Sequence, residues 1–355
     1  MKKGQAYAAG AIALLTALLL CGSPDASAQA GGTATWEFLN LTNSARVASL
    51  GGKNISLRDG DLNLVFHNPA LLDSNMHNHL LLNYVNYFAD INFGYASYSF
   101  HHGRWGSFAG GIHYINYGSF TAADETGVVT GNFTASENSV SLSWSYAIDS
   151  LFTAGATLKT VSSSFEQYSS FGMALDAGIN YYNPAHLLSL SFVMKNLGTQ
   201  LSTYYPGGAG EPLPFELQLG ISKQLEHAPF RFSLLCQHMQ DFSLDSPKRP
   251  GSGEDSSSEG FTGKAGELAN ELVRHMIVGV EFLPLQNLSL RAGYNNLRRH
   301  ELKIDERAST VGFSWGFGVK INRFRIDFGQ ARYHLAGSSN HFSVTASLSS
   351  LYSRQ

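Results

Sequence analysis

Apolar and polar residues alternate along most of the chain beyond residue 80, and helical spacing is almost absent. In one run, Val140, Leu142, Trp144, Tyr146 and Ile148 alternate with serine and alanine. Successive side chains of a β-strand point to opposite faces, so each run predicts a strand with one apolar and one small or polar face. About fourteen strands are predicted, near residues 80–88, 91–100, 107–117, 139–148, 152–161, 171–180, 187–195, 215–222, 230–239, 276–282, 288–295, 311–321, 324–332 and 342–348.

Short and long connections alternate between these runs. The second, fourth and later even-numbered links are short, as at Asp149-Ser150 and Asn322, whereas most odd-numbered links are long. The long links are 118–136, 198–213, 241–274 and 296–310. Strands of roughly nine to eleven residues can cross a bilayer at a tilt, with short turns inside the cell envelope and long loops outside. The pattern predicts an all-β fold, a transmembrane outer-membrane β-barrel of about 14 antiparallel strands over residues 79–355.

Charged residues of the predicted strands lie almost entirely on the face opposite the aromatic residues. They are Lys159, Asp176, Lys195, Glu216, Glu281, Arg291, Lys320, Arg325 and Asp327. A charge facing lipid at mid-membrane costs roughly 2–4 kcal/mol, so these side chains are predicted to face the lumen. Five are basic and four acidic, which favours a cross-linked or plugged interior over the single-sign ring of an ion filter.

Composition excludes several other classes of protein. The chain has 24 Lys+Arg against 27 Asp+Glu, for a net charge of −3, which lacks the basic excess of a nucleic-acid binder. Only 14% of residues are charged while 12% are aromatic, which argues against a disordered chain. Two cysteines are too few for a disulfide scaffold.

The first thirty residues are predicted to be a secretory signal peptide. Two lysines precede an apolar stretch at 8–20, and small residues follow, with cleavage expected after Ala28 or Ala30. The apolar stretch is too short to span a membrane as a helix. An alternative makes Cys21 a lipidated residue, although the leucine before it is larger than the usual small residue.

Three motifs resemble catalytic or ligand-binding sites. Gly312-Phe313-Ser314-Trp315-Gly316 fits a nucleophile pattern, but it lies within a predicted strand and no helix follows. The segment 260–265 resembles a phosphate loop with the wrong spacing. His77 and His79 lack an evident third metal ligand. We therefore predict no enzyme activity, no cofactor and no metal site.

The link 241–274 is the one break in composition, rich in Ser, Gly and Pro, with a short amphipathic helix predicted around Glu267–Leu272. It is interpreted either as a mobile surface loop or as a docking surface for an extracellular partner. The sequence identifies no individual partner-binding residue.

Residues 31–78 lack barrel patterning and are predicted to form a plug or hatch-like segment within the lumen. Trp36–Leu41, Ser44–Gly52 and Asn68–Leu72 together resemble the PorQ family of the type IX secretion system, within the FadL-like superfamily of long-chain fatty-acid outer-membrane transporters. The residues that carry this family signature are Ala45, Arg46, Leu50, Gly51, Gly52, Asn68, Pro69 and Ala70.

The resemblance implies a Bacteroidetes outer-membrane protein surrounded by outer-membrane lipid. It implies a non-enzymatic subunit that anchors a surface partner of the cargo attachment complex, with PorZ-like, PorU and PorV proteins as expected partners. The alternative function is FadL-like transport of hydrophobic small molecules, and the sequence leaves open whether the lumen binds a lipid or is fully plugged. One departure is the chain end at Leu348–Gln355, because outer-membrane barrels usually finish on an aromatic residue.

Overall fold

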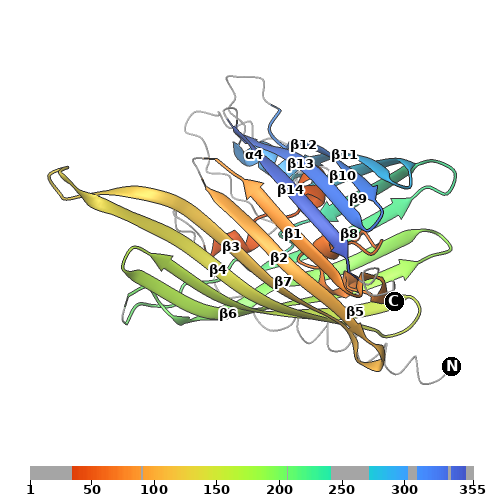
Figure 1. The fold of residues 1–355 in the computed structure, drawn as a ribbon, viewed down its shortest axis with the longest axis horizontal. Helices are drawn as coiled ribbons and strands as arrows, with labels where there is room; N and C mark the ends of the chain where they lie inside the picture. The colour runs from red at the N-terminus through yellow and green to blue at the C-terminus, as the bar shows by residue number, and fades with distance from the viewer. Residues whose placement is uncertain are drawn as a thin grey trace, which may run out of the picture. The chain divides into compact units, whose positions relative to one another are not determined.

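Fourteen antiparallel strands close into a barrel in which each strand pairs with the next in sequence and β1 pairs with β14 (Figure 1). This computed structural model describes residues 34–88, 91–205, 207–240, 272–302, 310–334 and 337–348. The strands are β1 (His79–Asn86), β2 (Asn92–His102), β3 (Gly106–Ala123), β4 (Val129–Ala147), β5 (Phe152–Phe165), β6 (Tyr168–Asn183), β7 (Leu188–Ser202), β8 (Glu216–Gln224), β9 (Phe230–Cys236), β10 (Met276–Leu285), β11 (Leu288–Asn295), β12 (Phe313–Ile321), β13 (Phe324–His334) and β14 (Gly337–Ser347). The predicted all-β barrel is confirmed.

Some of the sequence predictions fall outside the described residues. These are the signal peptide at 1–30 with Cys21, the 260–265 motif, and nearly all of the 241–274 link with its short helix. Within the part of the chain that is described, no helix is long and apolar enough to cross a membrane.

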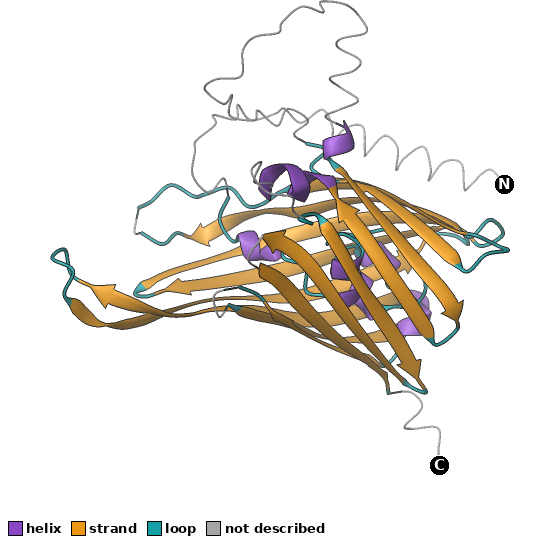
Figure 2. Cartoon of the chain, turned by 90° about the horizontal axis from the view of Figure 1, so that it is seen from above, coloured by secondary structure: helices purple, strands orange, loops and turns teal. Residues whose placement is uncertain are grey.

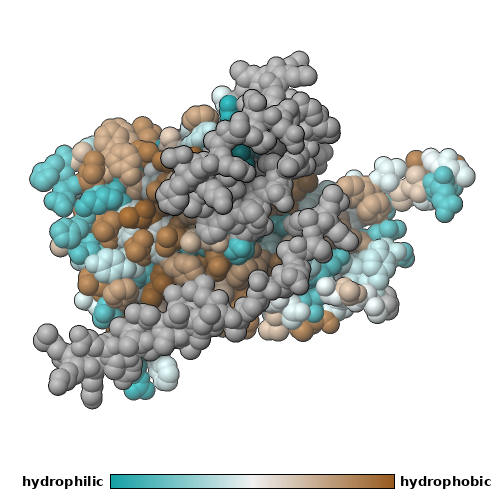
Figure 3. All heavy atoms as spheres, turned by 180° about the vertical axis from the view of Figure 1, so that it is seen from behind, coloured by the Kyte–Doolittle hydropathy of each residue, from teal (hydrophilic) through white to brown (hydrophobic). Residues whose placement is uncertain are grey.

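The outer surface of the barrel is apolar and the inner surface is small or polar. On β4, Leu142 is 58% exposed while its neighbour Ser143 is 3% exposed. In Figure 3, apolar side chains spread over the barrel wall while hydrophilic ones gather towards its ends. An exposed apolar surface of this extent is typical of a face that contacts lipid. The alternation predicted from the sequence is confirmed in both strand position and facing.

Strand lengths differ from the predicted nine to eleven residues. β3 and β4 have 18 and 19 residues and are joined by a turn, so most of the predicted loop 118–136 is strand. β9, in contrast, has only 7 residues. For β3 and β4, the reason is that apolar alternation marks only the part of a strand that faces lipid, whereas main-chain pairing continues into water with polar residues on both faces.

The six even-numbered connections are short, as predicted, and we call their end of the barrel the turn end. The first of them contains the helix η5 (Gly103–Trp105), and the last is the turn at Asn322. The opposite end, called the loop end, carries the 203–215 connection and the helix α4 (Asn296–Leu302). In outer-membrane barrels short turns face the periplasm and longer connections face the exterior.

Residues 34–78, which we call the N-terminal segment, lie inside the ring of strands (Figure 2). Side-chain oxygens start its short helices: the Ser44 hydroxyl accepts a hydrogen bond from the main-chain N–H of Val47, and Asp61, Asn68 and Asp73 act in the same way further along. The helices are η1 (Glu37–Asn40), α2 (Ala45–Ser49), η2 (Leu62–Leu64), η3 (Pro69–Leu71) and η4 (Ser74–Met76).

The N-terminal segment touches opposite walls of the barrel. The helix α2 packs against β11, β12, β13 and β14, whereas η3 packs against β4, β5 and β6. Apolar side chains of the segment form buried clusters, and one of these consists of Val47, Leu50, Leu57, Leu64 and Leu71. The hydrophobic core of this protein therefore lies inside the barrel, along the segment that crosses it.

Candidate functional site

The first group of predicted signature residues rests on glycines of the wall. The carbonyl of Ala45 lies where a side chain at Gly329 would be, and the main chain from Leu50 to Gly51 lies where one at Gly293 would be. A Cβ atom at either glycine would collide with main-chain atoms, which cannot move aside as a flexible side chain can. Wall glycines therefore allow the segment's backbone to approach the strands directly.

Gly51 and Gly52 make the turn that ends α2. Their φ angles are +101° and +98°, in a region that residues with a side chain rarely adopt. The N–H of Gly51 donates to the hydroxyl of Ser314 at 2.9 Å, and its carbonyl accepts from Nδ2 of Asn295 at 3.1 Å. Ser314 is the central residue of the nucleophile-like motif, so its hydroxyl serves a structural contact with the segment.

The second group, Asn68, Pro69 and Ala70, rests on the opposite wall. Asn68 accepts the N–H of Ala70 at 2.9 Å and donates from Nδ2 to the carbonyl of Ile55 at 2.8 Å, which fixes the turn. A Cβ atom at Gly155 would lie 2.5 Å from the nitrogen of Ala70. The structure thus divides the eight signature residues into two contact points on opposite walls instead of one shared pocket.

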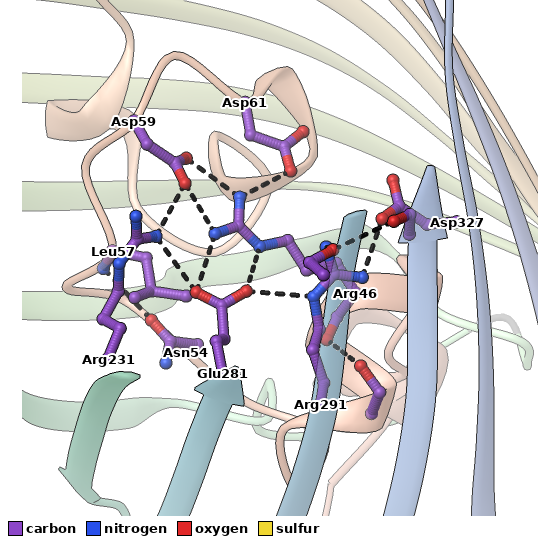
Figure 4. Close-up of polar contacts among 12 residues, drawn as sticks. Arg46, Asn54, Leu57, Asp59, Asp61, Arg231, Glu281, Arg291 and Asp327 are labelled. Carbon is purple, nitrogen blue, oxygen red and sulfur yellow. Dashed lines mark hydrogen bonds and ion pairs between the residues drawn. The ribbon is translucent and has the colours of Figure 1, made fainter. Parts of the chain in front are cut away.

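The guanidinium group of Arg46 is the centre of a buried ion network (Figure 4). Nε and Nη2 bind both oxygens of Glu281 at 2.9 and 3.0 Å, and Nη1 and Nη2 bind both oxygens of Asp59 at 2.9 and 2.7 Å. Nη1 also donates to Asp61 at 2.9 Å. All five N–H groups are satisfied by three carboxylates, an arrangement that lysine cannot reproduce.

Three arginines of the wall extend this network. Arg291 donates to Glu281 at 2.9 Å and to Asp327 at 2.7 Å. Arg231 bridges Asp59 and Glu281, at 2.7 and 3.0 Å. The third, Arg325, lies 3.3 Å from Asp61 and 3.2 Å from Asp327. The complete network, which we call the clamp, joins four arginines to four carboxylates and has no net formal charge.

Burial is what makes the charge balance of the clamp important. The side chains of Arg46, Asp61, Glu281, Arg291 and Asp327 are at most 2% exposed. Burial by itself would raise the pKa of Asp61, but the charges of Arg325 and Arg46 outweigh it and hold that pKa below its usual value. For Asp59, burial is likewise outweighed, by Arg46 and Arg231, and its pKa falls well below the ordinary range.

The lumen-facing charges predicted from the sequence are largely confirmed. In addition to the clamp, Lys159 pairs with Asp176 at 2.6 Å. Lys320 lies on the lumen side as predicted, where it lines the pocket at the turn end, but its side chain is exposed to solvent and is not part of the buried network. Arg231 was not among the predicted inward charges, although its place between two outward phenylalanines on β9 would have identified it.

The turn end contains an open pocket of about 560 Å³ beside the clamp, lined by Asp59, Asp61, Arg325 and His79 among others. Nδ1 of His77 accepts a hydrogen bond from the main-chain N–H of His101 at 3.0 Å. Among the described residues, no three His, Cys, Asp or Glu side chains are grouped so that they could hold a metal ion.

No protein-family profile matches the sequence, and no curated protein matches it. Among solved structures, the fold is similar to the Ralstonia pickettii toluene transporter TbuX, at 13% identity and a TM-score of 0.50 over 86% of this chain and 97% of that chain. It also matches the Pseudomonas putida toluene transporter TodX (15%, TM-score 0.48, 86% and 96%) and a Pseudomonas aeruginosa FadL homologue (12%, TM-score 0.46, 86% and 97%).

At these identities the likeness concerns the fold alone. A closed barrel with an even number of strands, an apolar outer surface and this fold is the form in which β-proteins cross a bacterial outer membrane. This chain is an outer-membrane β-barrel. In such a barrel each strand pairs with a neighbour on both sides. The main-chain N–H and C=O groups of the wall are therefore hydrogen-bonded within the sheet, and the wall can face hydrocarbon.

Proposed function

We propose that this protein is a non-enzymatic outer-membrane anchor that holds a partner protein at the cell surface, and that its N-terminal segment acts as a plug. The observation that carries the proposal is the clamp. A neutral set of eight charges, five of them buried, fixes a segment that touches both walls of the lumen. Displacing the segment from the wall would require breaking that network.

The resemblance to the PorQ family supports a more specific assignment. We assign the partner to the cargo attachment complex of a type IX secretion system, with PorZ-like, PorU and PorV proteins as the expected contacts. Each signature residue on which the resemblance rests has a structural part in seating the segment, since Ala45 to Gly52 contact one wall and Asn68 to Ala70 the other.

The test combines conductance with affinity purification. Purified protein in planar bilayers should show no ion conductance above the lipid background, whereas Gly293→Val, which removes the seat of the segment, should show open channels. Tagged full-length protein from detergent-solubilised outer membranes should retain a surface protein in stoichiometric amount. Stable conductance by the unaltered protein, or the absence of any stoichiometric partner, would contradict the proposal.

A second candidate function is transport of hydrophobic molecules, and the similarity of the fold to the toluene transporter TbuX favours it. One measurement, the rate of toluene entry into proteoliposomes, distinguishes the two functions. A transporter would speed entry of toluene into proteoliposomes that contain it, and the rate would rise with protein density. An anchor would leave that rate equal to the rate in protein-free vesicles.

A further inference from the structure

Beyond the barrel wall, β3 and β4 continue as a two-stranded ribbon, residues 117–134, which projects from the loop end (Figure 1). The pairing of β2 with β3 stops at Asn116, and the pairing of β4 with β5 stops at Ala135. Along the ribbon, no neighbouring strand of the described chain covers either edge. A free two-stranded ribbon is only marginally stable in water, so its side chains decide whether it persists.

A β-bulge sets which residues the ribbon shows on each face. Between Asn116 and Ser119, β3 carries one residue more than β4, and Gly118 at this point has a φ of +85°. Simple alternation would place Phe120 on the membrane side. The extra residue instead brings Phe120 opposite Phe133, where the two rings stack with their centroids 5.2 Å apart.

The stacked pair lies on the lumen side. On β4 the inward positions are every second residue, including Ala135 and Glu137, and Phe133 continues this series while Thr134 faces outward. The same side of the rim carries further aromatic rings: Tyr117 lies 5.7 Å from Phe165, which lies 5.8 Å from Tyr204. The aromatic residues on this side are therefore Tyr117, Phe120, Phe133, Phe165 and Tyr204.

The tip of the ribbon is apolar and acidic. Val128 and Val129 are 60% and 63% exposed, and residues 117–134 contain two acidic residues and no basic residue. The carboxylate of Asp124 accepts the N–H groups of Thr126 and Val128, both at 2.9 Å, so the tip is a fixed turn. Of the two acidic residues in the ribbon, Asp124 is therefore engaged within the turn, and Glu125 is the one whose carboxylate can meet a partner.

We propose that the ribbon is a docking arm for the surface partner, and this inference rests on the proposed anchoring function. The occupant that fits is a folded protein with an apolar groove for the ribbon and lysine or arginine residues at the end that meets Glu125. A lipid occupant does not fit, because the stacked phenylalanines face away from the membrane side. Exposed aliphatic residues at the tip distinguish the surface from a sugar-binding one.

The experiment places a photo-crosslinking amino acid at Val128 of the full-length protein in intact cells. A matched position at Leu285, which is 66% exposed at the turn end, is the control. We expect a cross-link from position 128, and not from 285, to a different protein, at a site next to basic residues. A cross-link to a second copy of this chain, to lipid only, or to nothing would overturn the inference.

A pair of double variants then separates the two proposals. Phe120→Ser with Phe133→Ser removes the stacked pair, whereas Thr121→Ser with Asn132→Ser changes the opposite face and serves as the control. We expect the first to lower recovery of the cross-linked partner at least tenfold and the second to leave it unchanged. Full recovery with the first variant overturns the docking arm but leaves anchoring intact, while absence of a partner from the unaltered protein as well refutes anchoring itself.

Discussion

Replacing Arg46 with methionine should release the N-terminal segment from the barrel wall while the barrel itself stays folded. Methionine has a similar length but no charge, so it leaves Asp61 and Glu281 buried with fewer cations around them. Removing one partner of a buried ion pair costs about 3–5 kcal/mol, chiefly because the remaining charge is left uncompensated. The clamp would change from neutral to a net charge of −1, which its wall arginines cannot correct.

The magnitude follows from the bonds that are lost. Arg46 makes five charge-assisted hydrogen bonds, but the carboxylates retain other arginines: Arg291 and Arg231 on Glu281, and Arg325 on Asp61. The lower half of that range is therefore expected, about 3–4 kcal/mol, which raises the population of released segment by about two to three orders of magnitude. For Arg46→Lys, the population of released segment should lie between those of the unaltered protein and Arg46→Met, because lysine keeps the charge but lacks the planar guanidinium group.

Chymotrypsin digestion of the detergent-solubilised protein measures this population, because cleavage of a transiently open segment follows the opening equilibrium. The bonds to follow by mass spectrometry are those after Leu57 and Phe66, which are buried in the native protein. The control is Arg58→Met, an arginine of the same segment that lies outside the clamp and whose hydrogen bond within the described residues goes to Asn180. It is compared at the bond after Phe66, because residue 58 directly follows Leu57. If Arg46→Met is cleaved no faster than Arg58→Met, the clamp does not hold the segment.

Three further predictions follow from the wall and the clamp. Gly293→Val should expose the segment to chymotrypsin, while Gly110→Ala, where a Cβ atom meets nothing within 4 Å, should not; equal protection of both variants would contradict the glycine contacts. Leu142→Arg places a charge against lipid and should lower the free energy of unfolding in vesicles by about 2–4 kcal/mol, as measured by urea titration. Because the pKa values of Asp59 and Asp61 are lowered in the folded protein, their stabilising contribution is full at neutral pH and is lost as the pH falls below the ordinary aspartate value of about 3.9. The free energy of unfolding, measured by urea titration at each pH, should accordingly stay constant between pH 7 and 5 and decline below that value.

The parts of the fold that lipid imposes were predictable from the sequence, and the parts that lie in water were not. Leu142 alternates with Ser141 and Ser143 because one face of β4 contacts hydrocarbon, so the periodicity reveals the strand. In the ribbon, residues such as Thr121 and Asn132 have water on both sides, and a bulge at Gly118 shifts the alternation as well. No single period then distinguishes strand from loop, although the chain is paired throughout.

The candidate site shows the same limit in its electrostatics. Periodicity assigned Glu281, Arg291 and Asp327 to the lumen, but pairing depends on which strands and turns meet inside the barrel, and Arg46 lies 235 residues from Glu281 in the sequence. Counting charges on the wall alone gives three arginines and two carboxylates in the clamp, an excess of one positive charge. The N-terminal segment contributes one arginine and two carboxylates, an excess of one negative charge. Neither part can bury its share of the clamp without the other, because removing an uncompensated charge from water is costly. The segment is therefore an electrostatic requirement of the closed interior, and a barrel assembled without it would have to keep water around the wall arginines.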